Sequence, residues 1–307
     1  MVKMNNRGHR FGGNWTEQKL DCVSNYLHEY TKIMNNQSFN FAYIDAFAGT
    51  GYREMEVDED TDELLFPDLV SPEVISFRDG SARNYLELKP PFMKYIFIEK
   101  DIDRHAELER LKQEYLLKPE FSENMIECEN EEANEYLKNL CGKNWRAHRA
   151  LVFLDPYGMQ VEWKTIESIA QTKAIDLWLL FPIGTVNRLL KRNGEIRPSI
   201  REKLNLFFGN EQWFEVFYRL AQRIPIFDED EQWEKTGDIF FEIEQYIMER
   251  LQETFAGVAA NPLSLRNSKN VPLYLLCFAA GNPKGAPIAV RIAEHVLLKQ
   301  LREGNLR

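Results

Sequence analysis

The chain has 307 residues, of which 44% are hydrophobic and 12% aromatic, so it can bury a sizeable core in one large domain or two. Its net charge of -10 excludes a general attraction to nucleic acid, although a local basic face would be enough to bind one. The four cysteines form no C-x-x-C pair and five histidines accompany them, which favours neither a zinc site nor a disulfide framework. The sequence has no apolar run of about 18 residues and no apolar core for export at its start, so we expect a cytoplasmic protein without membrane contact.

Short runs rich in Ile, Phe, Leu and Tyr alternate with amphipathic stretches along the chain. This alternation is typical of a parallel sheet covered by helices. The predicted strands are residues 41–46, 94–99, 125–128, 150–155, 174–181 and 272–279. The predicted helices are residues 15–34, 101–116, 131–140 and 164–172. We therefore predict an α/β, Rossmann-like fold.

Two segments interrupt this alternation. Residues 52–79 include seven acidic residues between positions 54 and 63, and we expect them to form a solvated loop. Residues 184–270 are mostly of helical and aromatic character and come before the last predicted strand. We therefore predict a main domain formed by residues 1–183 and 271–307, with residues 184–270 as a helical insertion subdomain.

The first predicted strand runs into the loop "AYIDAFAGTG", which contains Asp45, Phe47, Gly49 and Gly51. A phosphate-binding P-loop would need a lysine after its last glycine, and a dinucleotide fingerprint would need a third glycine; both are missing. An acidic residue at a strand end followed by G-x-G instead suits a ligand with a positive amino acid end and no phosphate, as in S-adenosylmethionine (SAM). The alternative is a turn that uses glycine for its backbone freedom.

Further polar residues follow the other predicted strands, where ligands bind in open parallel sheets. Glu99 could accept both hydroxyls of a ribose, or it could be a solvent-facing acid. Asn130 follows the third strand and could reach an adenine amino group. The fourth strand ends in "FLDPYG", where Asp155 and the carbonyls beside Pro156 could accept hydrogen bonds from an amino group and Tyr157 could stack on a base. The alternative is a strand stop with Tyr157 in the core.

Together these residues resemble the motifs of class I SAM-dependent methyltransferases. Asp45, Gly49 and Gly51 are similar to the first motif, Glu99 to the ribose-binding acid, and Asp155-Pro156-Tyr157 to a variant of the amino-methylating motif. The usual motif has two prolines before its aromatic residue and this chain has one, so DPYG is similar instead to the motif of the tRNA guanine-N2 dimethyltransferases. The resemblance implies SAM as cofactor and a mostly parallel sheet with one antiparallel strand.

A narrower resemblance covers nearly the whole chain. Its motifs are WTEQKL (15–20), YIDAFAGTG (43–51), GSA (80–82), FLDPYG with VEW (153–163), IDLWLLFP (175–182), NRLL (187–190) and FAAGN (278–282). They resemble those of the three-Cys-motif partner proteins, a bacterial, methyltransferase-like family. The resemblance implies association with a companion protein that carries a three-cysteine motif and is similar to radical-SAM enzymes.

A basic run lies in residues 187–203, which hold six Lys or Arg against two Glu. Such a cluster is unusual in an acidic protein, and it could follow the phosphates of a nucleic acid beside the cleft through Arg188, Lys191, Arg192 and Arg197. The alternative is a solvated arm that makes ion pairs with residues 228–234.

The sequence therefore predicts a SAM-dependent methyltransferase that acts on an exocyclic amino group of a base in RNA or DNA. Asp155, Pro156 and Tyr157 would serve the acceptor, and Asp45, Phe47, Gly49, Gly51, Glu99 and Asn130 would serve the cofactor. One alternative is an accessory subunit that keeps the SAM fold in order to bind the three-cysteine-motif companion. Another is an enzyme that acts on a protein or a small molecule.

Overall fold

The protein is represented by a computed structural model, which describes residues 14–48, 81–220 and 233–305. Its centre is an eight-stranded sheet in the order β3-β2-β1-β4-β5-β10-β8, with β9 also pairing with β10. Five strands form a parallel array, and they are β1 (Asn40–Asp45), β2 (Lys94–Ile98), β3 (Ile126–Glu129), β4 (His148–Leu154) and β5 (Ile175–Phe181). This confirms the predicted α/β class and all five of these strands.

The reversed strand β10 (Pro272–Ala280) lies antiparallel to β5. On its other side β10 pairs antiparallel with β8 (Gly257–Val258) and β9 (Leu263–Arg266), which follow one another along the same edge. Five parallel strands flanked by one reversed strand give the sheet a methyltransferase-like topology, and the single reversal matches the prediction. Because β8 and β9 belong to this sheet, the chain re-enters it at Gly257, before the predicted boundary at residue 271.

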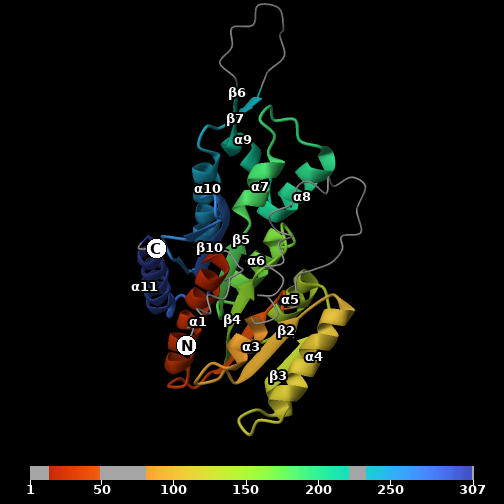
Figure 1. Cartoon of the computed structure of the whole chain (residues 1–307), viewed down its shortest axis with the longest axis vertical. Coiled ribbons are helices and arrows are strands. Elements are labelled where there is room, and N and C mark those ends of the chain that lie inside the picture. The colour runs from red at the N-terminus through yellow and green to blue at the C-terminus, as the bar shows by residue number, and fades with distance from the viewer. Residues whose placement is uncertain (1–13, 49–80, 221–232, 306–307) are drawn as a thin grey trace, which may run out of the picture.

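Helices cover both faces of the sheet, as Figure 1 shows. The first face is covered by α1 (Asn14–Met34), α3 (Ser81–Leu86), α4 (Ile102–Leu116) and α11 (Ala286–Asn305), and we call it the α1 face. The second face is covered by α5 (Ala133–Cys141) and α6 (Trp163–Gln171). The side chains of β5 alternate between the two, with Leu177 in the core of the second face and Trp178 in that of the α1 face.

The segment after β5 forms α7 (Ile183–Leu189), α8 (Pro198–Phe208), α9 (Trp213–Phe217) and α10 (Ile239–Thr254), with the short strands β6 (Tyr218–Leu220) and β7 (Trp233–Lys235). These helices gather at the end of the sheet formed by β5 and β10, opposite β3 (Figure 1). Their aromatic residues join the core of the sheet, since the ring of Phe207 lies 5.2 Å from that of Phe181. The helical segment therefore shares its core with the rest of the chain.

Gly209 fixes the approach of α8 to α6. It ends α8 in the left-handed conformation, at φ +75°, where glycine is favoured. A Cβ at this position would lie 2.6 Å from the ring of Trp163 at the start of α6. The close packing between the helical segment and α6 therefore requires glycine here.

None of the helices in the described ranges is both long and apolar enough to cross a membrane. All four cysteines are free thiols, and burial raises the pKa of Cys128 and Cys141 to about 12. Among the described residues, no group of three or more His, Cys, Asp or Glu side chains could hold a metal ion.

Candidate active site at the carboxyl edge of the sheet

Two buried carboxyl groups lie at the ends of neighbouring strands. Asp45 is the last residue of β1, and Asp155 directly follows β4. In the register of the two strands Asp45 stands opposite Phe153, and the Ala46 N–H donates to the Phe153 carbonyl at 3.2 Å. The exposed fractions of the two residues are 2% and 5%. The chain leaves β1 towards β2 and β3 and returns to β4 on the other side, so this is the switch point of the sheet, where open α/β folds bind ligands.

Lys19 is a site residue that the sequence analysis did not single out. It projects from α1, and its Nζ donates to Asp155 Oδ2 at 2.6 Å while its side chain is 2% exposed. The ring centroids of Trp15 and Phe153 each lie 5.9 Å from Nζ. Lys19 lies four residues after Trp15 and four before Val23, so the three side chains lie on the same buried face of α1. This spacing could have identified Lys19 from the sequence.

Two tyrosines lie beside the carboxyl pair on the α1 face. Tyr43 in β1 and Tyr85 in α3 are fully buried, and their ring centroids are 4.8 Å apart. Burial raises the pKa of both phenols well above the usual value, and the charges of Asp45 and Asp155 raise it further. Both hydroxyls therefore stay protonated at physiological pH, and they add neutral hydrogen-bonding groups to the site.

Glu99 and Asn130 lie at the ends of β2 and β3 as predicted. Glu99 is half-buried, and its Oε1 accepts the Asp101 N–H at 2.7 Å, which leaves Oε2 without a partner among the described residues. The Asn130 amide is exposed and donates to the carbonyls of Glu99 and Lys100 at 2.9 and 3.0 Å. Asn130 thus ties the two strand ends together, while the adenine contact stays a prediction.

The predicted acceptor residues follow β4 in a tight loop. Pro156 is buried and Tyr157 is half-buried, and the Tyr157 ring packs against the core of the α1 face. Gly158 has φ +65°, a conformation that favours glycine. The stacking of Tyr157 on a base stays a prediction, and its core contact agrees with the alternative considered for this residue.

Phe47 donates its backbone N–H to Asp45 Oδ1 at 3.2 Å, and its side chain packs against the core of the second face. This contact fixes the carboxyl group at the point where the chain leaves β1. Gly49 and Gly51 lie outside the described residues.

The basic run lies in α7, the following turn and the start of α8. Arg188 is half-buried, with Nη2 3.5 Å from Thr185 Oγ1, whereas Lys191, Arg192 and Arg197 are exposed. Since α7 begins directly after β5, this run starts at the same carboxyl edge as the two aspartates. Most of residues 228–234, the alternative partners of the run, lie outside the described ranges.

Lys235 in β7 binds the backbone at the start of this basic run. Its Nζ donates to the carbonyl and to Oδ1 of Asn187 and to the carbonyl of Leu190, at 2.7, 2.6 and 2.9 Å. Burial, with a smaller effect of the Arg192 charge, lowers the pKa of Lys235 to about 8. This half-buried ammonium group holds the last turn of α7 in place.

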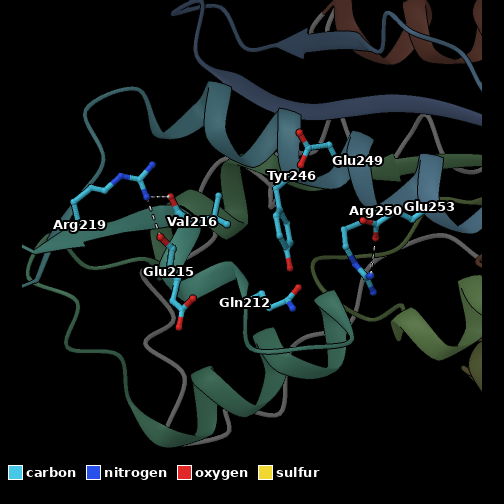
Figure 2. Close-up of a pocket in the computed structure, with 8 residues that line it drawn as sticks. All are labelled: Gln212, Glu215, Val216, Arg219, Tyr246, Glu249, Arg250 and Glu253. Carbon is cyan, nitrogen blue, oxygen red and sulfur yellow. Dashed lines mark hydrogen bonds and ion pairs between the residues drawn. The ribbon is translucent and has the colours of Figure 1, made fainter.

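A pocket of about 420 Å³ lies between α9 and α10, away from the strand ends (Figure 2). It is lined by Gln212, Glu215, Val216, Arg219, Tyr246, Glu249, Arg250 and Glu253. Arg219 donates to the carbonyls of Glu215 and Val216, and Arg250 binds Glu253. Its two guanidinium groups are already engaged, and it contains none of the residues predicted to act on a ligand.

No protein-family model matches the chain, and no curated protein matches it. Among solved structures it is similar to a Legionella pneumophila protein of the DUF519 family, with 10% identity, coverage of 95% of this chain and 94% of that one, and a TM-score of 0.42. A Listeria monocytogenes protein provisionally assigned as a SAM-dependent methyltransferase has 11% identity, coverage of 84% and 98%, and a TM-score of 0.34. A provisionally assigned Haemophilus influenzae methylase has 15% identity, coverage of 69% and 85%, and a TM-score of 0.28. At these values the similarities carry no argument about activity.

Proposed function

We propose that the protein is a SAM-dependent methyltransferase that acts on an exocyclic amino group of a nucleic-acid base. The observation that carries this proposal is the pair of buried carboxyl groups, Asp45 and Asp155, at adjacent strand ends of a methyltransferase-like sheet. Glu99 stands on the next strand of the same edge. Each part of the reaction would then be bound at a different strand end. The ribose would bind at β2, the amino acid end of the cofactor at β1 and the methyl acceptor at β4.

The residues at this edge fit SAM. When bound, SAM supplies a methyl group that an amino nitrogen takes up by in-line displacement. Glu99 Oε2 would accept the ribose hydroxyls, and the Asp45 region would face the positive amino acid end. Asp155, oriented by Lys19, would hold the acceptor amino group, so the chain contributes chiefly by binding and alignment.

Replacing Glu99 by alanine is expected to weaken SAM binding by about 1.5 to 3 kcal/mol, the usual range for lost hydrogen bonds to a charged group. Isothermal titration with SAM and S-adenosylhomocysteine measures this effect. Glu131→Ala removes an exposed carboxylate from the loop after β3 and serves as the control. Absence of binding to the wild type would remove the basis for the methyltransferase proposal.

Neutralising Lys191, Arg192 and Arg197 together is expected to weaken binding to RNA or DNA. Each lost phosphate contact lowers the salt dependence, log K against log[salt], by about 0.7 to 0.9, so the slope should become shallower by about 2 to 3. Transfer of labelled methyl groups from SAM to total RNA and genomic DNA should fall in parallel.

The matched control for this triple variant changes three exposed cations near the amino ends of β4 and β5, namely Lys143, Arg146 and Lys173. These changes should leave both binding and transfer as in the wild type. Equal losses in the two variants would mean that net charge, and not the run at the carboxyl edge, determines binding.

The second candidate function is an accessory subunit of a three-cysteine-motif companion, as the family resemblance implies. The observation that favours it is the ion pair of Asp155, because Oδ2 of the carboxylate that would hold the methyl acceptor is already bound to Lys19. Purified protein would then bind SAM without transferring its methyl group to RNA, DNA or extract protein, with or without the companion. Transfer that depends on added RNA or DNA would support the enzyme instead.

A further inference from the structure

The side chain of Asn134, at the start of α5, makes four hydrogen bonds and is 6% exposed. Its Nδ2 donates to Glu132 Oε1 at 2.8 Å and to the Gln160 carbonyl at 2.9 Å. Its Oδ1 accepts the Glu162 N–H at 3.0 Å and the Thr165 hydroxyl at 2.8 Å. Four bonds use the full capacity of an asparagine side chain, so Asn134 binds groups of the protein itself, two on the backbone and two on side chains, and not a ligand.

Gln160 connects Asn134 to the loop after β4, residues 155–160, which we call the acceptor loop. Its backbone carbonyl is held by Asn134, while its side-chain Oε1 reaches back and accepts the Tyr157 N–H at 3.0 Å. Gly158, with φ +65°, makes the turn between the two residues. Since Gln160 is exposed and makes its bond at the loop surface, its side chain contributes to loop order and little to the core.

A second pair of hydrogen bonds joins the ends of β2 and β3 at the same edge of the sheet. Asn130, four residues before Asn134, donates to the carbonyls of Glu99 and Lys100. Side-chain amides thus connect the chain after β2, which carries Glu99, to the start of α5, and α5 to the loop after β4, which carries Tyr157. The backbone from Asn130 to Asn134 links the two sets of hydrogen bonds, one at the strand end that carries Glu99 and the other at the loop that carries Tyr157.

We infer that Asn134 and Gln160 are positioning residues that hold the backbone of Tyr157 in the geometry needed for methyl transfer. This inference rests on the proposed methyltransferase function. Transfer depends on aligning donor and acceptor, and a displacement of about 1 Å can cost about 100-fold in rate. Losing the Gln160 bond should therefore reduce turnover without changing the affinity for SAM, whose proposed contacts lie at the ends of β1, β2 and β3.

The test uses Gln160, because removing the buried Asn134 would also destabilise the fold. Gln160→Leu removes the acceptor for the Tyr157 N–H, and Gln160→Glu keeps an oxygen at that position. Hydrogen exchange is measured over residues 155–162. The Tyr157 amide should exchange at least tenfold faster than in the wild type in the leucine variant, and within twofold of the wild-type rate in the glutamate variant. The kcat for methyl transfer should fall at least tenfold in the leucine variant and recover to at least half in the glutamate variant, with the Kd for SAM within twofold throughout.

The control is Asn144→Leu, which removes a similar exposed acceptor of a backbone N–H, that of Arg146, at the opposite edge of the sheet. It should change neither exchange at Tyr157 nor turnover. Unchanged exchange in Gln160→Leu would overturn the inference, as would faster exchange with unchanged kcat. If the wild type transfers no methyl group, the proposed function fails, and exchange at Tyr157 alone then decides whether Gln160 holds this loop.

Discussion

Replacing Lys19 by methionine is expected to lower the free energy of unfolding by about 3 to 5 kcal/mol, the range for removing one partner of a buried ion pair. Methionine fills much of the volume of the lysine stem but leaves Asp155 in a buried site without the ammonium group at 2.6 Å. The loss should therefore come from the uncompensated carboxylate and not from a cavity. Urea unfolding followed by tryptophan fluorescence measures it.

The same helix offers a matched control in Lys32, which pairs with Glu29 at 2.8 Å while both side chains are about half exposed. Lys32→Met should cost less than about 1 kcal/mol, as is usual for surface pairs. The double variant Lys19→Met with Asp155→Leu should recover most of the loss, because an apolar pair of similar volume replaces both charges. If Lys19→Met costs no more than Lys32→Met, the buried pair does not form in solution.

The parallel strands and the helices beside them could be predicted because each carries a strong local signal. The strand β5 has seven residues, all apolar except Asp176, and is buried along its whole length, so its run of side chains predicts a central strand. By contrast, β8 has two residues and β9 has four, LSLR, and such short runs are not enough to predict a strand. These strands exist because β10 provides an edge for them, which is a tertiary effect.

The candidate site was predictable only in part, for a related reason. Residues at strand ends, such as Asp45, Glu99 and Asp155, could be found because strand prediction fixes where each strand stops. The bond between Lys19 and Asp155 joins positions 136 residues apart, and no local pattern connects them. The anchoring of the acceptor loop by Asn134 likewise depends on how α5 lies against that loop.

Replacing Asp176 by asparagine is expected to stabilise the protein at pH 8 by about 2 to 4 kcal/mol. Asp176 lies near the amino end of β5, beneath Tyr26 and Tyr30 of α1, and burial raises its pKa from 3.8 to about 7 against the opposing effects of the Gly281 N–H and the Arg149 charge. Since one pKa unit corresponds to about 1.4 kcal/mol, the cost of ionising this group in the folded state is at most about 4 kcal/mol.

The sign of the pH dependence follows from the order of the two pKa values. Between about pH 4 and pH 7 the folded protein keeps the proton of Asp176 while the unfolded chain releases it, so the stability of the wild type falls as the pH rises through this window. Asparagine stays neutral and still offers Oδ1 to the Gly281 N–H, which Asp176 now accepts at 3.0 Å. The two proteins should therefore be about equally stable at pH 4, and the variant should lead increasingly up to pH 7 and by a constant margin above it.

Urea unfolding at pH 4.5, 6 and 8 measures this difference, with Asp238→Asn as the control because Asp238 is exposed. The control should show no gain that grows with pH, because the Asp238 side chain is not buried on folding. A loss of stability at pH 8 in Asp176→Asn would mean that Arg149 and the Gly281 N–H stabilise the charged carboxylate by more than burial opposes it. Asp176 would then hold β5 and the end of β10 together as an anion, and not as a neutral acid beneath α1.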